Sequence, residues 1–339
     1  MSDTASPSRK ALAWGVLASL IAALLIPLFD VLIDVTLLPD QGASWYYWKL
    51  ADPTWITRLS AWLPYVIHQG LVWYLIYRLV QSRKRTDGTL NRWNIALFAV
   101  NAVFVVAHFV QTYFFYDGTA QDVPVMSSQG SVIVMLVLIL IMENRRRGLF
   151  FGRKVPLPKD GVLLTRKFHG YYIAWAAVYT FWYHPVVSSV AHVMGFFYMF
   201  LLFVQLSLAY TREHLNKYWT LALEVTVLVH GTTVAFFTQD SIIWTMFFSG
   251  FLTLFIVTQI YGLGLPKRAI RMASGVYLVA VLALYTFYPD GAFSTERLAQ
   301  LYQLTWIPII EYGMVFAFAG ILWGVSLVPG VNRTLHPLR

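Results

Sequence analysis

The sequence predicts an all-α, polytopic transmembrane helical bundle of about ten spans, and three observations support this fold class. Of the 339 residues, 58% are hydrophobic and only 12% are charged, and the mean hydropathy is +0.60. Apolar runs long enough to cross a hydrocarbon layer of ~30 Å recur almost without interruption from Ala11 to Val328. Basic residues gather at alternate ends of these runs, which is the positive-inside pattern. Such values exclude a soluble globular domain.

The first four helices are delimited by their charged flanks. The apolar run after the polar segment 1–10 is too long for a signal-peptide core and lacks a small-residue cleavage site, so it is expected to remain as the first span. The second span ends before the basic run 83–85, and the fourth ends before Arg145, Arg146 and Arg147. The expected helices are 11–37, 59–81, 93–116 and 127–143.

Six further helices are expected after a longer basic segment. Residues 144–169 carry Pro156, Pro158 and Gly161 as helix breakers, and they form the longest inner loop. The chain therefore divides into a cytoplasmic tail 1–10, four helices within 11–143, the cytoplasmic loop 144–169, six helices within 170–328 and a cytoplasmic tail 329–339. The six helices are 170–184, 186–210, 217–237, 241–264, 268–288 and 304–328. An even number of spans places both termini in the cytoplasm.

Composition also bounds the partners and the chemistry. The net charge of +9 reports membrane topology rather than a nucleic-acid partner, because the basic residues lie at span ends. Membrane lipids are the expected surroundings, in a bacterial-type inner (plasma) membrane, and an oligomer or a partner subunit stays open. The chain has no cysteine, which excludes disulfides, thiolate zinc sites and iron–sulfur clusters. Any metal would need nitrogen and oxygen ligands.

Ionisable side chains recur in the outer halves of the apolar segments. An ionisable residue inside a bilayer is costly, so it is a functional hypothesis by default. Converting residue number to depth at ~1.5 Å per residue places several of them roughly 8–14 Å below the outer boundary. The layer contains His68, His108, His192, His230, Asp30 and Glu311, with His184 and Asp34 nearer the entrance.

We predict a metal site in this layer. The preferred ligands are His68, His108 and His230, with His192 next, and Asp30 or Glu311 is a further ligand or general base. Asp30 and Asp34 are spaced i, i+4, and positions 184, 188 and 192 would share one face of a helix that starts at Pro185. The expected supporting or entrance residues are Asp34, Gln69, Gln111, His184 and Ser188.

Three functions remain open from the sequence. The first is a metalloenzyme with iron or zinc, facing the periplasmic or outer side, that performs redox or hydrolytic chemistry on a lipid-like or small amphipathic substrate. The second is a proton- or cation-coupled transporter, in which the acids and histidines form a relay. The third is a b-type haem protein with two axial histidines. The remaining hypothesis is that the protein is a structural subunit of a larger complex. For any single histidine, a hydrogen bond between helices is the ordinary explanation.

Overall fold

The computed structural model describes residues 6–39, 41, 48–82, 89–238 and 243–336. Helices dominate these residues, and their only β pairing consists of two isolated bridges, Leu37 with Leu50 and Phe150 with Arg153. The basic run 83–85, the first half of the tail 1–10 and the first two residues of the expected helix 241–264 lie outside the described residues. The all-helical class is confirmed.

Within the residues that the structure describes, seven helical segments are long and apolar enough to cross a membrane. A helix lies at each of the ten expected ranges, but the shorter α8 and the more polar α2 and α5 are not among these seven. The coarse statement therefore holds: the chain carries several long apolar helices, which is compatible with a membrane protein. The ten spans and the cytoplasmic placement of both termini stay predictions. The seven segments are Pro7–Asp30, Arg92–Phe115, Val125–Arg147, Val190–Ser207, Lys217–Phe237, Lys267–Phe287 and Thr295–Ser326.

The chain divides into two compact units. Unit 1 comprises Met1–Val132 and Gly170–Thr226, and unit 2 comprises Ile133–His169 and Val227–Arg339. The boundaries fall inside three helices, so α4, α5 and α7 each contribute residues to both units. Their bounds are Val125–Arg147, Lys159–Tyr183 and Lys217–Thr238.

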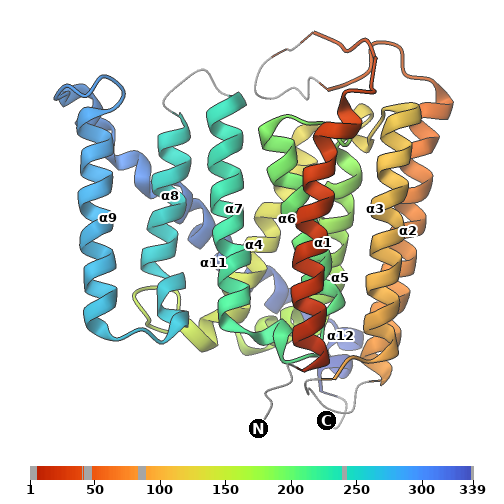
Figure 1. Ribbon diagram of the computed structural model, residues 1–339. Helices are drawn as coiled ribbons and strands as arrows, with labels where there is room; N and C mark the ends of the chain where they lie inside the picture. The colour runs from red at the N-terminus through yellow and green to blue at the C-terminus, as the bar shows by residue number, and fades with distance from the viewer. Residues whose placement is uncertain (1–5, 40, 42–47, 83–88, 239–242, 337–339) are drawn as a thin grey trace, which may run out of the picture. The chain divides into compact units, whose positions relative to one another are not determined.

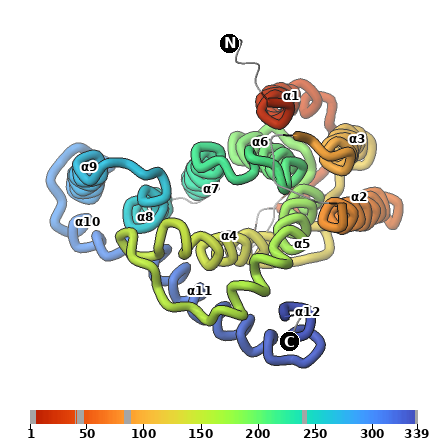
Figure 2. The backbone as a smooth tube through the Cα atoms, turned by 90° about the horizontal axis from the view of Figure 1, so that it is seen from below, coloured from red at the N-terminus to blue at the C-terminus, as the bar shows by residue number. Residues whose placement is uncertain are grey.

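Unit 1 is a helix bundle in which α3 packs against both α2 and α6, and α1 packs along α6 (Figure 1, Figure 2). Local sequence sets the helix ends. Ser6 caps α1, whose first residue is Pro7, and Asn91 and Asn94 form a reciprocal capping box at the start of α3. The elements are α1 (Pro7–Asp30), α2 (Trp55–Ser82), α3 (Arg92–Phe115), η1 (Thr119–Gln121), α6 (Val190–Ser207) and η2 (Glu213–Leu215).

In unit 2, α8 packs against both α9 and α11, and α9 runs antiparallel to α8 (Figure 1). Tyr277 and Tyr285 of α9 are buried in its core. Tyr285 shares a hydrogen bond of 3.1 Å with Ser249 of α8, and Tyr277 shares one of 2.6 Å with Thr253. The elements are α8 (Ile243–Val257), η3 (Gln259–Leu263), α9 (Lys267–Phe287), α10 (Thr295–Ala299), η4 (Gln300–Thr305), α11 (Trp306–Ser326) and α12 (Pro329–Leu335).

The first helix ends at Asp30, so the expected end at residue 37 is wrong. Beyond the turn at Val31 the chain runs extended and pairs with residues 49–51, where Leu38 N donates to Lys49 O at 2.9 Å. Hydropathy cannot distinguish an apolar strand-like segment from a continuing helix. The β-branched residues Ile33, Val35 and Thr36 favour the extended form.

Three other boundaries differ for identifiable reasons. The sixth helix begins at Val190 rather than near 186, because the Ser189 side chain caps it. The fifth begins at Lys159, since charged residues continue a helix beyond its apolar stretch. Unit 2 reaches α11 through α10 and η4, so the last apolar span begins at Thr295 rather than at 304.

Candidate functional site

Four of the predicted histidines lie in unit 1, on and beside the helices that surround the end of α5. His68 is on α2, His108 is on α3, His184 follows α5 and His192 is in the first turn of α6. His68 and His108 are completely buried, and His192 is only 8% exposed. The His108 ring lies 4.3 Å from the ring of Trp182, which is itself fully buried. The end of α5 is therefore the common neighbour.

Both ring nitrogens of His68 are held by protein groups. Nε2 donates to Asn101 Oδ1 at 3.0 Å, and Nδ1 accepts from Trp182 Nε1 at 3.2 Å. The donor-only indole therefore fixes a neutral ring with its proton on Nε2. Asn101 in turn donates to Ser207 Oγ at 3.1 Å. His68 thus joins α2, α3, α5 and α6 as a hydrogen-bonding group, and a metal would have to displace one of these partners.

His108 also contacts protein oxygens through both ring nitrogens. Its Nε2 donates to the backbone carbonyl of His184 at 2.8 Å, and Nδ1 lies 2.9 Å from Gln111 Oε1. Gln111 donates to Ser60 Oγ at 3.1 Å and to the carbonyl of Asp117 at 2.9 Å. The predicted supporting residue Gln111 is thereby in contact with His108. Both ring nitrogens thus contact protein oxygens, and a neutral ring can donate to only one of the two.

The rings of His184 and His192 lie next to each other. Their ring centres are 5.4 Å apart. His184 Nδ1 donates to Thr180 O at 3.0 Å, and His192 Nδ1 shares a hydrogen bond of 2.7 Å with Ser189 Oγ. These local contacts orient both rings through Nδ1.

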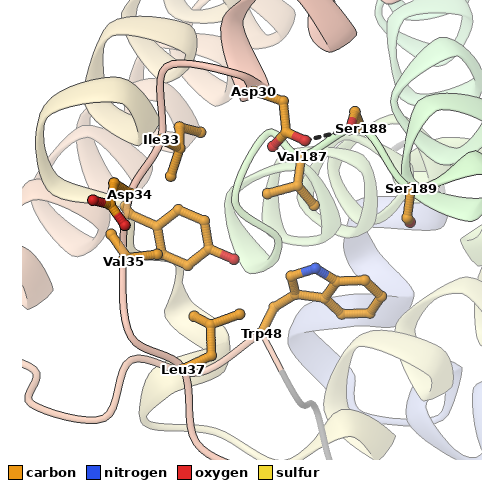
Figure 3. Close-up of a pocket in the computed structure, with 10 residues that line it drawn as sticks. Asp30, Ile33, Asp34, Val35, Leu37, Trp48, Val187, Ser188 and Ser189 are labelled. Atoms are coloured by element: carbon orange, nitrogen blue, oxygen red, sulfur yellow. Dashed lines mark hydrogen bonds between the residues drawn. The ribbon is translucent and has the colours of Figure 1, made fainter.

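A pocket of about 280 Å³ opens beside this pair (Figure 3). Asp30, at the end of α1, accepts a hydrogen bond from Ser188. Trp48, which lines the pocket, places its ring 4.0 Å from the His192 ring. The lining residues are Asp30, Ile33, Asp34, Val35, Leu37, Trp48, Tyr116, Val187, Ser188 and Ser189, and none of them is basic.

The acids also affect the wall of this pocket. Burial raises the pKa of Tyr116 above its ordinary value, and the nearby carboxylates of Asp30 and Asp117 add to the rise. The phenol therefore stays neutral and can donate a hydrogen bond. The pocket combines two carboxylates, two aromatic side chains and two serine hydroxyls.

Two predicted alignments are wrong. Asp30 and Asp34 do not share a helical face, because α1 ends at Asp30; instead both line the pocket. Residues 184, 188 and 192 do not form a helical stripe, because α6 starts at Val190. Ser188 turns to Asp30, while His184 approaches His192 through an irregular segment.

His230 and Glu311 belong to unit 2, so the two units divide the predicted site residues. Glu311 is expected near the start of a helix at 304, but the last apolar span begins earlier, at Thr295. Its neighbour Tyr312 shares a hydrogen bond of 2.6 Å with Thr258, just beyond the end of α8. The opposite end of α8 carries Trp244, which donates to Tyr288 at 3.3 Å. Glu311 thus lies toward the end of α8 where α9 begins.

Glu311 and Gln69 are among the described residues with buried polar atoms that lack a hydrogen-bond partner. Glu311 is 4% exposed and its Oε2 has none, and Gln69 is 5% exposed with neither amide atom paired. Gln69 therefore makes no hydrogen bond to a histidine. Among the residues that the structure describes, no three histidine, aspartate or glutamate side chains are arranged to hold a metal ion.

Several side chains of this region were not predicted. Trp182 and Asn101 hold His68, and Trp48 and Tyr116 line the pocket. Asn101 was visible in the sequence as a rare polar residue within an apolar run, which is a usable signal for a buried partner. Trp182 lies in an aromatic stretch and carried no comparable signal. Comparisons with protein-family models, with curated proteins and with solved structures found no match.

Proposed function

We propose that the protein is a membrane carrier for a small organic cation, which enters through the pocket of unit 1. The observation that carries this proposal is the composition of the pocket lining. Asp30 and Asp34 supply two carboxylates, and the described lining residues include no lysine, arginine or histidine. A positively charged ligand is favoured there, because opposite charges attract more strongly in a partly dehydrated site than in water.

The aromatic side chains support the same ligand class. Trp48 and Tyr116 line the pocket together with the two acids. A cation above an aromatic face gains about 0.5–2 kcal/mol, with the larger values in dehydrated sites. The volume of about 280 Å³ suits a small alkylammonium group with part of its hydration shell.

Buried polar side chains beyond the pocket favour a carrier over a surface receptor. From the backbone of His184 the hydrogen bonds continue to His108 and Gln111. Farther along the bundle, Asn101 bonds to Ser207, and Asn94 donates to the carbonyl of Ser207 at 2.7 Å near the start of α3. Polar groups at these depths in a membrane bundle typically mark substrate or ion pathways.

A binding experiment tests the first half of the proposal. We expect tetramethylammonium to bind the purified protein, with quenching of tryptophan fluorescence as the readout, and neutral tert-butanol not to bind. Asp30→Asn and Asp34→Asn should each weaken binding by about tenfold, since each removes one charge interaction. The exposed Asp52 supplies the control, Asp52→Asn, which should bind as the wild type does. Equal binding of the neutral compound, or unchanged binding in both pocket variants, would overturn the proposal.

Transport tests the second half. Protein reconstituted into vesicles should accumulate labelled tetramethylammonium, and Asp30→Asn should abolish that uptake. Binding without uptake by the wild type would remove the carrier role and leave a cation-binding membrane protein.

The His184–His192 pair favours a second candidate, the predicted metalloenzyme. At metal–nitrogen bonds of ~2.0–2.1 Å, two imidazoles on one ion have ring centres roughly 5 Å apart, close to the 5.4 Å between these rings. In this alternative both imidazoles would bind iron or zinc, while the hydrogen bonds at Nδ1 orient the two rings. Asp30, which accepts a hydrogen bond from Ser188 in the segment between the two histidines, would be the carboxylate ligand.

Elemental analysis separates the two candidates. The metalloenzyme requires stoichiometric iron or zinc that falls in His184→Gln and in His192→Gln but not in the control His169→Gln. Metal-free wild-type protein after growth with added iron and zinc would eliminate this candidate. The ligand roles of His68, His108 and His230, the general-base role of Glu311 and the haem alternative stay predictions that no contact in the described residues favours.

A further inference from the structure

Arg297 is a buried arginine in unit 2. It lies in the short helix α10, where its backbone N donates to Ser294 Oγ at 3.1 Å, and only 6% of the residue is exposed. The guanidinium lies 5.3 Å from the centre of the Tyr285 ring, which is fully buried. A permanently charged group is thus enclosed at the start of the last apolar span.

The hydrogen bonds of this guanidinium leave one edge unsatisfied. Nη1 donates to Gln300 Oε1 at 2.6 Å, whereas Nη2 makes only a long contact of 3.4 Å with Thr245 Oγ1. Nε is buried and has no partner. Because Nε and Nη2 lie on the same edge of the guanidinium plane, they form the fork that matches two oxygens of one carboxylate or phosphate.

No carboxylate among the described residues forms an ion pair with Arg297. Glu296, its neighbour in sequence, is exposed. An uncompensated buried charge is strongly unfavourable, so buried arginines are ordinarily paired with an anion. Both Gln300 and Thr245 present neutral oxygens, so within the described part of the chain the positive charge has no counter-ion.

The surroundings indicate headgroup depth. Trp244 and Tyr288 lie at the same end of α8, with ring centres 5.2 Å apart, and Tyr285 is one turn before Tyr288. Tryptophan and tyrosine side chains concentrate where a membrane meets water. Phosphate groups are the principal anions at that depth.

We propose that Arg297 anchors a binding site for a phosphate group, held through the Nε and Nη2 edge of its guanidinium. The site is independent of the pocket of unit 1. Two sources share this chemistry, the headgroup of an anionic phospholipid and free inorganic phosphate, and the aromatic neighbours favour the phospholipid.

Native mass spectrometry of the detergent-purified full-length protein tests this assignment, with phosphatidic acid and inorganic phosphate as separate probes. We expect a phosphatidic acid adduct on the wild type, reduced about tenfold or more in Arg297→Gln. Arg297→Lys keeps the charge but lacks the fork, and we expect an intermediate loss. Arg271→Gln, at an exposed arginine of α9, is the control and should bind as the wild type does.

The two probes, phosphatidic acid and inorganic phosphate, distinguish the two sources of the phosphate group. An Arg297-dependent adduct of phosphatidic acid supports the lipid source, and an Arg297-dependent effect of inorganic phosphate alone supports the free ion. Circular dichroism checks that Arg297→Lys and Arg297→Gln are folded. If both variants bind the probe as strongly as the wild type does, the proposal is overturned. Asp240 lies outside the described residues and is tested directly. If Asp240→Asn lowers the melting temperature as much as Arg297→Gln and neither probe binds the wild type, Arg297 is an internal ion-pair residue and the proposal fails.

Discussion

The imidazole of His68 and the amide of Asn101 are joined by a buried hydrogen bond of 3.0 Å between α2 and α3. Both residues are more than nine-tenths buried, at 0% and 4% exposure. Trp182 completes the shell of His68, so the ring has a donor on one side and an acceptor on the other. The contact makes His68 a positioning residue of unit 1 rather than a ready metal ligand.

Asn101→Ala should destabilise the protein by about 1–3 kcal/mol, because it leaves the His68 N–H without an acceptor inside the bundle. A double-mutant cycle with His68→Leu and Asn101→Leu, measured by chemical unfolding in detergent, isolates the pair. We expect a coupling energy of about 1 kcal/mol. Strictly additive effects would show that the two side chains do not stabilise each other.

Gly118→Ala should displace the segment that carries His184. A Cβ at this position would lie 2.5 Å from the backbone oxygen of Tyr183 and 3.1 Å from its carbonyl carbon, so backbone must move. We expect a loss of about 1–3 kcal/mol in unfolding free energy, as for other overpacked sites, and weaker tetramethylammonium binding. Gly130→Ala is the matched control, because a Cβ there meets nothing within 4 Å. Equal stability of the two variants would contradict the close approach.

Asp117 should make stability depend on pH. Burial raises the pKa of this carboxyl from 3.8 to about 6, and the residue lies beyond the end of α3. The folded protein then binds a proton more tightly than the unfolded chain, so this contribution to stability is present below about pH 4 and is lost as pH rises toward 6.

Asp117→Asn tests that dependence, since an amide oxygen can still accept from Gly118 N as Asp117 Oδ1 does at 2.8 Å. Melting curves from pH 4 to 7 should show a variant that is more stable than the wild type at pH 7 and flatter between pH 4 and 6. The exposed Asp52 offers the comparison Asp52→Asn, for which we expect the wild-type profile. A steeper dependence of melting temperature on pH in the Asp117 variant would mean that folding does not raise the pKa of Asp117.

Asn144 should hold the loop between α4 and α5 in unit 2. Its Nδ2 donates to Val155 O at 2.8 Å, and its Oδ1 accepts from Val155 N at 3.0 Å. Asn144→Ala removes both bonds and should speed tryptic cleavage after the exposed Arg153 several-fold, because local opening becomes easier. Glu143→Ala removes only an exposed ion pair with Arg146 and should cleave at the wild-type rate. Equal rates in the two variants would argue against the clamp.

The fold class and the helices could be predicted because the length of an apolar run and its basic flanks are visible in the sequence alone. Their ends could not be predicted where neighbours in space decide them. The pairing of Leu37 with Leu50 ends the first helix early, and hydropathy treats both outcomes alike. The start of the sixth helix was ambiguous for another reason. Pro185 and Ser189 are both residues that can begin a helix, and the structure uses Ser189 as the cap.

The candidate site was predicted in part. Spacing along each span identified His184, His192, Asp30 and Asp34 as polar groups of one region, and they surround the pocket or lie beside it. Which side chains face one another depends on the order and rotation of helices, which span order does not encode. The indole of Trp182, far along the chain, takes up the nitrogen of His68 that the metal hypothesis needed.

Since Gly170–Thr226 completes a unit that Met1–Val132 begins, the order of synthesis has a consequence for His68. Trp182 leaves the ribosome 114 residues after it. At about 5–20 residues per second, His68 waits roughly 6–23 s for its donor. During that interval water, lipid headgroups or the insertion machinery must satisfy the imidazole, so α2 settles fully only after α5 has been made.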